Sequence, residues 1–201
     1  GAVVLYADNF NAAELSVALN HLIAHYHEQC LLAMNICDGQ GLNRDIQEII
    51  IMSAKDGTNV TLRQATFDDI DFVYQLQCEP QTRKYARNPE IPAYDNHVEW
   101  MKRKLNADDS FFYIIVNEGA CGVIRLDPVE HAFAKYEISI FLTSACHGKG
   151  IASAAIKRAL MLHKGITILA TVLPENHTSH QLFERIGFYK LSSSEYISEK
   201  K

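Results

Sequence analysis

The sequence predicts an α/β fold, more narrowly an α+β arrangement around one mixed sheet. From residue 60 onward, strand-like and helix-like runs follow in the order strand, two helices, three strands, helix, strand, helix, strand. A glycine-bearing turn at residues 146–152 also joins a β-branched run to a helix-like run. Residues 1–57, by contrast, hold a single strand-like run and short helical runs, which predicts an extension that is not a complete domain.

The elements of the first half are assigned from local patterns. Residues 60–65 predict a strand, and Thr66 with Asp69 three positions later forms a variant of the capping box. That pair begins a helix that runs to about residue 78. The remaining expected elements are an irregular stretch at 80–92, a helix at 96–105, and a hairpin of 111–116 with 120–126 around the turn at 117–119.

The second half is assigned in the same way. The β-branched run at 136–142 predicts a strand, and residues 150–163 predict the helix after the glycine turn. Residues 167–173 alternate between apolar and polar side chains and predict another strand. Asn176 is suited to cap the next helix, with Ser179 in its first turn and Gly187 at its end. Residues 188–191 begin the last expected strand.

Composition excludes several classes of function. The 201 residues are 48% hydrophobic, with a net charge of −5 and no basic stripe, which argues against nucleic acid as a partner. No apolar run is long enough to span a bilayer. Five scattered cysteines predict reduced thiols and a cytoplasmic protein. Nine histidines are present, but even His21 and His25, one helical turn apart, lack a third ligand, so no metal site is expected.

Residues 146–152 have the features of an anion site. A strand, a glycine turn and a helix N-terminus in that order direct free backbone N–H groups and the positive end of the helix dipole to one point. Gly148 and Gly150 allow a phosphate to approach the backbone closely. The glycine spacing fits neither the Walker loop nor the complete dinucleotide fingerprint.

Two motifs in this region resemble signatures of the GNAT acetyltransferase superfamily. The first has the pattern Gln/Arg-x-x-Gly-x-Gly/Ala, in which Gly150 and Ala152 fill the last two places and His147 replaces the usual Gln or Arg. The second is Asn-x-x-Ser-x-x-hydrophobic-aromatic-Glu-Lys/Arg-x-Gly-Phe, found at residues 176–188. The resemblance covers residues 60–197 and implies the acyl-CoA N-acyltransferase fold for a domain at 58–201.

The resemblance implies acetyl-CoA as co-substrate. In the family, the sheet splays between the strands expected at 136–142 and 167–173, and the pantetheine arm pairs with the first strand like an added strand. Backbone N–H groups of the glycine turn hold the pyrophosphate. Lys149 is either an additional contact or a solvated surface lysine. The residues expected against the co-substrate are Ile140, Phe141, Leu142, His147, Gly148, Lys149, Gly150, Ile151, Ala152, Ser153, Asn176 and Phe183.

Catalysis in such a site needs a base for the amine and stabilisation of the developing oxyanion. Glu137 lies where many family members carry a catalytic glutamate; its alternative role is a strand residue in a salt bridge. A backbone N–H near Leu142 would stabilise the oxyanion. Phe183 stands where many relatives place a tyrosine that protonates the thiolate, so Tyr189, His180, a water molecule or unassisted departure would have to replace it.

Acceptor contacts in the family come largely from the first two helices and their connection. Arg83 or Arg87 would pair with phosphate, unless both are ordinary surface arginines, and Tyr85 would stack on a base or sugar. Trp100 is expected to be buried instead. The Arg-then-His-x-x-Trp arrangement, which includes His97, resembles acetyltransferases acting on nucleotide-linked amino sugars in pseudaminic acid synthesis.

The N-terminal extension adds a further resemblance. Helical spacing is expected at 11–28, 28–36 and 42–52, followed by a polar linker at 53–59. The motif Asp38-Gly39-x-Gly41-x-x-Arg44 resembles the C-terminal tail of the UDP-sugar hydrolases of the same pathway. Residues 1–57 are therefore expected to be either the remnant of a truncated hydrolase domain or a helical extension that packs on the second domain.

The reaction expected from these resemblances is N-acetylation of a UDP-linked amino-deoxy sugar for surface polysaccharide or flagellin glycans. An excess of Arg and Lys over acidic residues at 80–105 favours such a phosphorylated acceptor. Two alternatives are a protein N-terminal acetyltransferase of the ribosomal kind and a non-catalytic acetyl-CoA-binding module.

Overall fold

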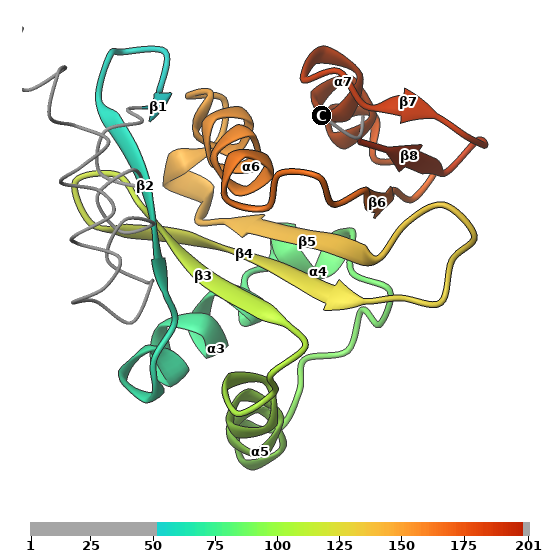
Figure 1. The fold of residues 1–201 in the computed structure, drawn as a ribbon. Coiled ribbons are helices and arrows are strands. Elements are labelled where there is room, and N and C mark those ends of the chain that lie inside the picture. Colours follow the sequence, from blue (N-terminus) through green and yellow to red (C-terminus); the bar gives the residue numbers. More distant parts are fainter. Residues whose placement is uncertain (1–51, 199–201) are drawn as a thin grey trace, which may run out of the picture. The chain divides into compact units, whose positions relative to one another are not determined.

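The computed structural model describes residues 52–198, which form one mixed sheet with helices on both faces (Figure 1). In this part of the chain the strand order is β1-β2-β3-β4-β5-β6-β8-β7. All neighbours are antiparallel except β5 and β6, which are parallel. The strands are β1 (Met52–Ser53), β2 (Asn59–Gln64), β3 (Phe111–Val116), β4 (Ala120–Pro128), β5 (Tyr136–Leu142), β6 (Ile168–Thr171), β7 (Tyr189–Lys190) and β8 (Glu195–Ile197).

The helices divide between the two faces of the sheet. The long α6 covers one face, while α3 and α5 pack on the other (Figure 1). The described helices are η2 (Phe67–Asp69), α3 (Ile70–Cys78), α4 (Pro80–Lys84), α5 (Tyr94–Leu105), η3 (Ser144–Cys146), α6 (Ile151–Leu162) and α7 (His177–Arg185).

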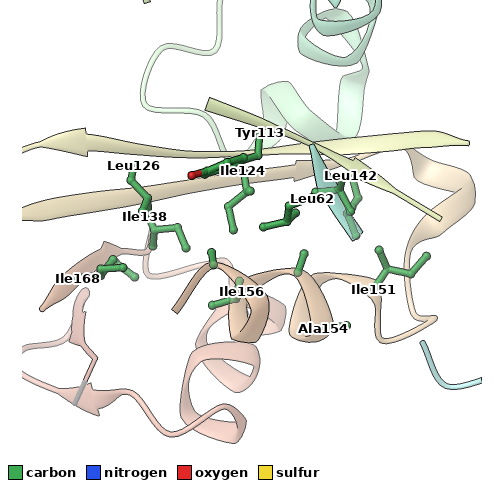
Figure 2. Packing of buried hydrophobic residues seen from close by; sticks show 14 of the residues in the cluster. Leu62, Tyr113, Ile124, Leu126, Ile138, Leu142, Ile151, Ala154, Ile156 and Ile168 are labelled. Carbon is green, nitrogen blue, oxygen red and sulfur yellow. The ribbon is translucent and has the colours of Figure 1, made fainter. Parts of the chain in front are cut away.

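The larger core lies between α6 and the sheet. Figure 2 shows Ile151 and Ile156 of α6 facing Ile124 and Ile138 of the central strands. These four side chains are at most 6% exposed, and each contributes about 1.5–3 kcal/mol by burial. This packing fixes the start of α6, and with it the glycine turn, against the end of β5.

A second, smaller core lies on the opposite face. Val73 and Leu76 of α3 and Met101 of α5 are at most 1% exposed and pack with Phe112 and Ile114 of β3. Side chains of β5 therefore alternate between the two cores, since successive residues of a strand point to opposite faces. This alternation places residues 137, 139 and 141 on the face of α3 and α5.

Most of the expected elements are confirmed, and the capping box of Thr66 and Asp69 is present, although the first turn it begins is a 3₁₀ turn. The irregular stretch expected at 80–92 was wrong at its start, where Pro80 opens α4 at a position that suits proline. The strand β8 was missed, although it is β8 that pairs with β6. Its three residues carry no periodic signal of their own.

The region before residue 58 also differs from expectation. Met52 and Ser53, expected to end a helix and begin a linker, form β1 and pair with β2. Gly57 permits the connecting turn because its φ is +87°. The elements predicted at residues 1–51 lie outside the described residues.

Candidate functional site

The site begins where β5 and β6 separate. Their parallel pairing comprises Tyr136 with Ile168 and Glu137 with Leu169, and then β6 pairs with β8 instead. Beyond Glu137, the edge of β5 that faces away from β4 has no strand partner among the described residues. The splay expected from the sequence is therefore present at this point of the sheet.

The register of β5 decides which of its backbone groups face this open edge. The N–H of Thr143 donates to the carbonyl of Cys121 at 2.9 Å, and the N–H of Val129 donates to that of Lys135 at 3.1 Å. Both bonds belong to one unbroken antiparallel register with β4. The backbone N–H and C=O groups of successive residues in an antiparallel strand point to opposite edges. The backbone groups of the odd-numbered residues of β5 therefore bond to β4, and those of the even-numbered residues point to the open edge.

Ile140 and Leu142 thus direct their N–H groups to the open edge, as a strand-like ligand requires. Phe141, which was expected beside them, does not, because its backbone groups face Val123 of β4. The carbonyl of Leu142 already accepts a hydrogen bond from Nε2 of His147 at 3.1 Å. His147 therefore fixes the end of β5 to the glycine turn.

The glycine turn itself has the conformation of an anion cradle. Gly148 and Gly150 have φ values of +75° and +83°, and Gly150 is the residue before α6. The first turn of α6 leaves the N–H groups of Ile151, Ala152 and Ser153 without partners within the helix. A Cβ added at Gly148 would meet no described atom within 4 Å, so this side of the turn is open. Lys149 is exposed beside it.

Sequence analysis missed one residue at this turn, Lys55. Its N–H donates to the carbonyl of Lys149 and its Nζ to the carbonyl of Gly148, each at 2.8 Å. Lys55 comes from the turn between β1 and β2, and 93 positions separate it from Gly148. No local pattern indicates such a contact.

The helix α7 follows β6, the strand that separates from β5 at the site. Oδ1 of Asn176 accepts from the N–H of Ser179 at 3.2 Å, which confirms Asn176 as the helix cap. Phe183 is 4% exposed and packs against Phe188, with ring centroids 5.1 Å apart. Phe183 is therefore a core side chain, at a position where the family signature carries a tyrosine.

The two side chains named as replacements for that tyrosine are placed differently. His180 lies on α7, where Nε2 donates to the carbonyl of Leu173 at 3.1 Å and Nδ1 lies 2.7 Å from the hydroxyl of Tyr196. Tyr189 is 58% exposed on β7, and β8 separates it from β6. Both nitrogens of His180 are thus already engaged.

A charged cluster lies on the other face of the open strand. Glu137 is directly opposite Asp127 of β4 and forms an ion pair with Arg87. The Asp127 carboxylate accepts from Nζ of Lys104 at 2.6 Å and from Nε of Arg125 at 2.5 Å. The Glu137 side chain is 17% exposed, whereas that of Arg87 is 69% exposed. The salt bridge that was the alternative role of Glu137 is therefore present.

Arg83 and His97, also expected to contact the acceptor, form hydrogen bonds within the protein instead. Arg83 donates to the carbonyls of Asn88 and Glu90 at 3.2 and 3.0 Å and so holds the loop after α4. His97 is 2% exposed and its Nε2 lies 3.0 Å from the carbonyl of Ile70, so it does not reach the surface. Burial is the main cause that lowers the pKa of His97.

The two aromatic residues of this region, Tyr85 and Trp100, differ in where they lie. Tyr85 is half-buried, with Nζ of Lys84 5.0 Å from its ring centroid, and stays near the surface after α4. Trp100 packs beneath Arg125, whose guanidinium lies 5.0 Å from its ring centroid, and against Phe112. Trp100, which was expected to be buried, is partly buried and packs against the smaller core.

Within residues 52–198, no helix is long and apolar enough to cross a membrane. In the same part of the chain, no group of three or more His, Cys, Asp or Glu side chains is arranged to hold a metal ion.

The comparisons with known proteins agree with this architecture. The family model described as the acetyltransferase (GNAT) domain matches residues 59–189. Spermidine N(1)-acetyltransferase of Escherichia coli K12 is 22% identical over 137 residues, which cover 65% of this chain and 73% of that protein.

Two solved structures share the fold. Spermidine N-acetyltransferase of Vibrio cholerae, in complex with CoA and spermine, superposes with a TM-score of 0.59 at 22% identity, over 66% of this chain and 82% of that one. A ribosomal alpha-N-protein acetyltransferase in complex with coenzyme A superposes with a TM-score of 0.60 at 15% identity, over 74% of this chain and 97% of that one.

Proposed function

Because the chain belongs to the GNAT family of acetyltransferases, we propose that it acetylates a primary amine on a small molecule that also carries phosphate. Membership of the family makes the chain an acetyl-CoA-dependent N-acetyltransferase. The finer proposal is that the acceptor is a UDP-linked amino-deoxy sugar. Arg87, an exposed cation in contact with the candidate base Glu137, is the observation that carries it.

The residues of the open edge fit the co-substrate. The N–H groups of Ile140 and Leu142 point away from β4 and would bond to the amides of the pantetheine arm. The N–H groups at residues 149–153 would hold the pyrophosphate, and the open side of Gly148 leaves room for it. Acetyl-CoA supplies the acetyl group as an activated thioester.

Glu137 is suited to accept the proton of the amine. Its carboxylate lies on the open strand, one residue before the point at which β5 loses its pairing with β6. In the structure, Oε1 of Glu137 is occupied by its ion pair with the exposed Arg87. An acceptor whose phosphate binds Arg87 would leave Oε1 free to accept the proton.

The oxyanion would be stabilised by a backbone group, whereas the leaving thiolate needs no protein acid. The N–H of Leu142 points to the open edge and would stabilise the negative oxygen that develops on the acetyl carbon. Phe183 carries no proton to donate. Thiols are acidic enough, with a pKa of about 8.5, for the thiolate to leave without a protein acid.

The charges around Glu137 favour an anionic acceptor over a polycation. In the described part of the chain, the ion pairs of Arg87, Arg125 and Lys104 involve two carboxylates, Glu137 and Asp127. A phosphate would compete for Arg87 and release Glu137, whereas a polyamine would meet an excess of positive charge.

A polyamine is the second candidate acceptor, because two of the proteins with similar sequence or fold are spermidine acetyltransferases by name. A protein N-terminus is the third, for the corresponding reason. The acceptor is decided by measuring thiol release from acetyl-CoA with a UDP-linked amino sugar, the same sugar without the nucleotide, spermidine and a peptide.

The expected result is the highest kcat/KM with the UDP-linked amino sugar. In Arg87→Met, the ratio of kcat/KM for the UDP-linked sugar to that for the free sugar falls about tenfold or more. Arg103→Met, which removes an exposed cation of α5, is the matched control and keeps the ratio. A higher kcat/KM for spermidine, or an unchanged ratio in Arg87→Met, refutes the phosphate-bearing acceptor; no thiol release with any amine supports the non-catalytic module.

A further inference from the structure

We propose that Lys55 is a positioning residue of the pyrophosphate site, because it orients the backbone N–H groups of Lys149 and Gly150 toward the bound phosphates. The inference rests on the proposed binding of acetyl-CoA at the glycine turn. It adds a residue that lies before the part of the chain matched by the family model, residues 59–189.

Two hydrogen bonds connect Lys55 to successive carbonyl groups of the turn. Its backbone N–H donates to Lys149 and its side-chain Nζ to Gly148, both at 2.8 Å. The side chain also lies across Gly150, since a Cβ at that position would be 3.0 Å from Cγ of Lys55. One residue thus contacts three consecutive positions of the turn.

The direction of these bonds determines where the N–H groups point. In a trans peptide the carbonyl and the following N–H point in opposite directions, and the described chain has no cis peptide bonds. The carbonyls of Gly148 and Lys149 point to Lys55, so the N–H groups of Lys149 and Gly150 point away from it. These N–H groups are donors of the proposed pyrophosphate site.

The turn needs such a restraint because of its glycines. Gly148 and Gly150 both have positive φ, and glycine adopts other backbone conformations at little cost. A peptide between them is free to rotate and to present its carbonyl to the phosphate, which would repel it. Lys55 holds the orientation that attracts an anion, and its ammonium group adds positive charge at the turn.

Lys55 itself is held in place by a well-bonded turn. The N–H of Ala54 donates to the carbonyl of Thr58 at 2.9 Å, and Asp56 accepts from the N–H and hydroxyl of Thr58 at 3.0 and 2.6 Å. Ala54 is 7% exposed in the core beneath α6. The turn that carries Lys55 is therefore fixed to the same helix as the anion site.

The test compares ligands with and without the pyrophosphate. Lys55→Met keeps the aliphatic stem over Gly150 but removes Nζ, Lys55→Arg keeps a donor, and Lys157→Met removes an exposed lysine of α6 as the control. Binding of CoA is measured by calorimetry. Turnover is measured with acetyl-CoA and with acetyl-pantetheine, which lacks the pyrophosphate.

In Lys55→Met, we expect the Kd for CoA to rise about tenfold or more, because a hydrogen bond from a charged group is lost. The ratio of kcat/KM for acetyl-CoA to that for acetyl-pantetheine falls by a similar factor, because the KM for acetyl-CoA rises. Lys55→Arg recovers part of the loss and Lys157→Met shows none.

Two outcomes overturn the role of Lys55 but leave the proposed function standing. One is CoA binding by Lys55→Met as tight as in the unchanged protein. The other is an equal loss of kcat/KM with both acyl donors, which indicates general damage to the fold. Failure of the unchanged protein to bind CoA refutes the proposed function instead.

Discussion

At the scale of single residues, Glu137 shows how neighbouring groups set the role of a carboxylate. The alternation of β5 places it on the face of α3 and α5, opposite Asp127 and in contact with Arg87. The partner Arg87 is exposed, so a ligand that binds its guanidinium can separate it from the Glu137 carboxylate.

Glu137→Gln tests whether this carboxylate takes the proton of the amine. We expect kcat to fall about 10²-fold or more, since the amide cannot accept a proton, while the Kd for CoA changes less than about twofold. Thiol release and calorimetry measure the two quantities. Glu99→Gln, an exposed change on α5, is the control. Unchanged turnover in Glu137→Gln would remove Glu137 from the catalytic role.

Buried histidines give the stability a defined pH dependence. The hydroxyl of Tyr113 lies 3.0 Å from Nε2 of His163, and burial raises the pKa of Tyr113 to about 12, so the hydroxyl keeps its proton at neutral pH. Burial lowers the pKa of His163, and it is also the main cause that lowers the pKa of His97. Both rings therefore favour the neutral form in the folded protein.

As the pH falls below about 6.5, the unfolded chain binds protons at these histidines before the folded one does. The free energy of unfolding is thus largest above this pH and declines below it. In His163→Phe, its slope against pH between about 7 and 5 decreases, as measured by denaturant unfolding at several pH values. His177→Gln, at an exposed position of α7, is the control for the removal of a histidine. An equal slope in His163→Phe would contradict the role of burial.

At the scale of elements, the short β6 is what opens the sheet. It pairs with β5 at two positions only and is then held by β8, with Ala170 opposite Tyr196. The capped α7 follows directly after this strand. Asn176 therefore has two roles to separate, the observed cap of α7 and the proposed contact with the co-substrate.

Two substitutions of Asn176 separate these roles. Asn176→Ala removes the oxygen that accepts from Ser179 and is expected to lower the free energy of unfolding by about 1 kcal/mol. Asn176→Asp keeps an acceptor and favours the helix dipole, but loses the Nδ2 donor. If Nδ2 contacts the co-substrate, Asn176→Asp weakens CoA binding without lowering the melting temperature. Equal CoA binding in both variants and the unchanged protein would limit Asn176 to the cap.

At the scale of the whole molecule, the described part of the chain contains its own cores. Among residues 52–198, the buried members of both clusters lie from Ala54 onward, and the described part of the sheet begins at Met52. The boundary expected after residue 57 therefore cuts through the sheet, because β1 and the turn with Lys55 precede it.

A chain shortened to residues 50–201 is expected to fold and to bind CoA as the full chain does. Its melting temperature should change by less than about 4 °C, because no described core residue is removed. A chain that begins at residue 59 lacks β1 and Lys55 and should bind CoA more weakly. Loss of cooperative unfolding on removal of residues 1–49 alone would show that the described cores are insufficient.

The sequence by itself determined the features that depend on neighbours within a few positions. Asn176, the capping box of Thr66 and Asp69, the glycine turn, and the long strands all follow from contacts or periodicity within one or two turns of chain. Together with the two signatures they were sufficient for the fold and the family.

Only the tertiary structure decided which residues meet across the chain. Lys55 contacts Gly148 across 93 positions of sequence, and Arg87 contacts Glu137 across 50. His97, expected at the acceptor site, is buried in the core, and Arg83 bonds to the loop that follows its own helix. The same holds for β8, whose three residues become a strand only because β6 offers an unpaired edge. The local sequence pattern determines secondary structure. A contact between residues far apart in the sequence depends instead on how the helices and strands pack together, which no short stretch of sequence specifies.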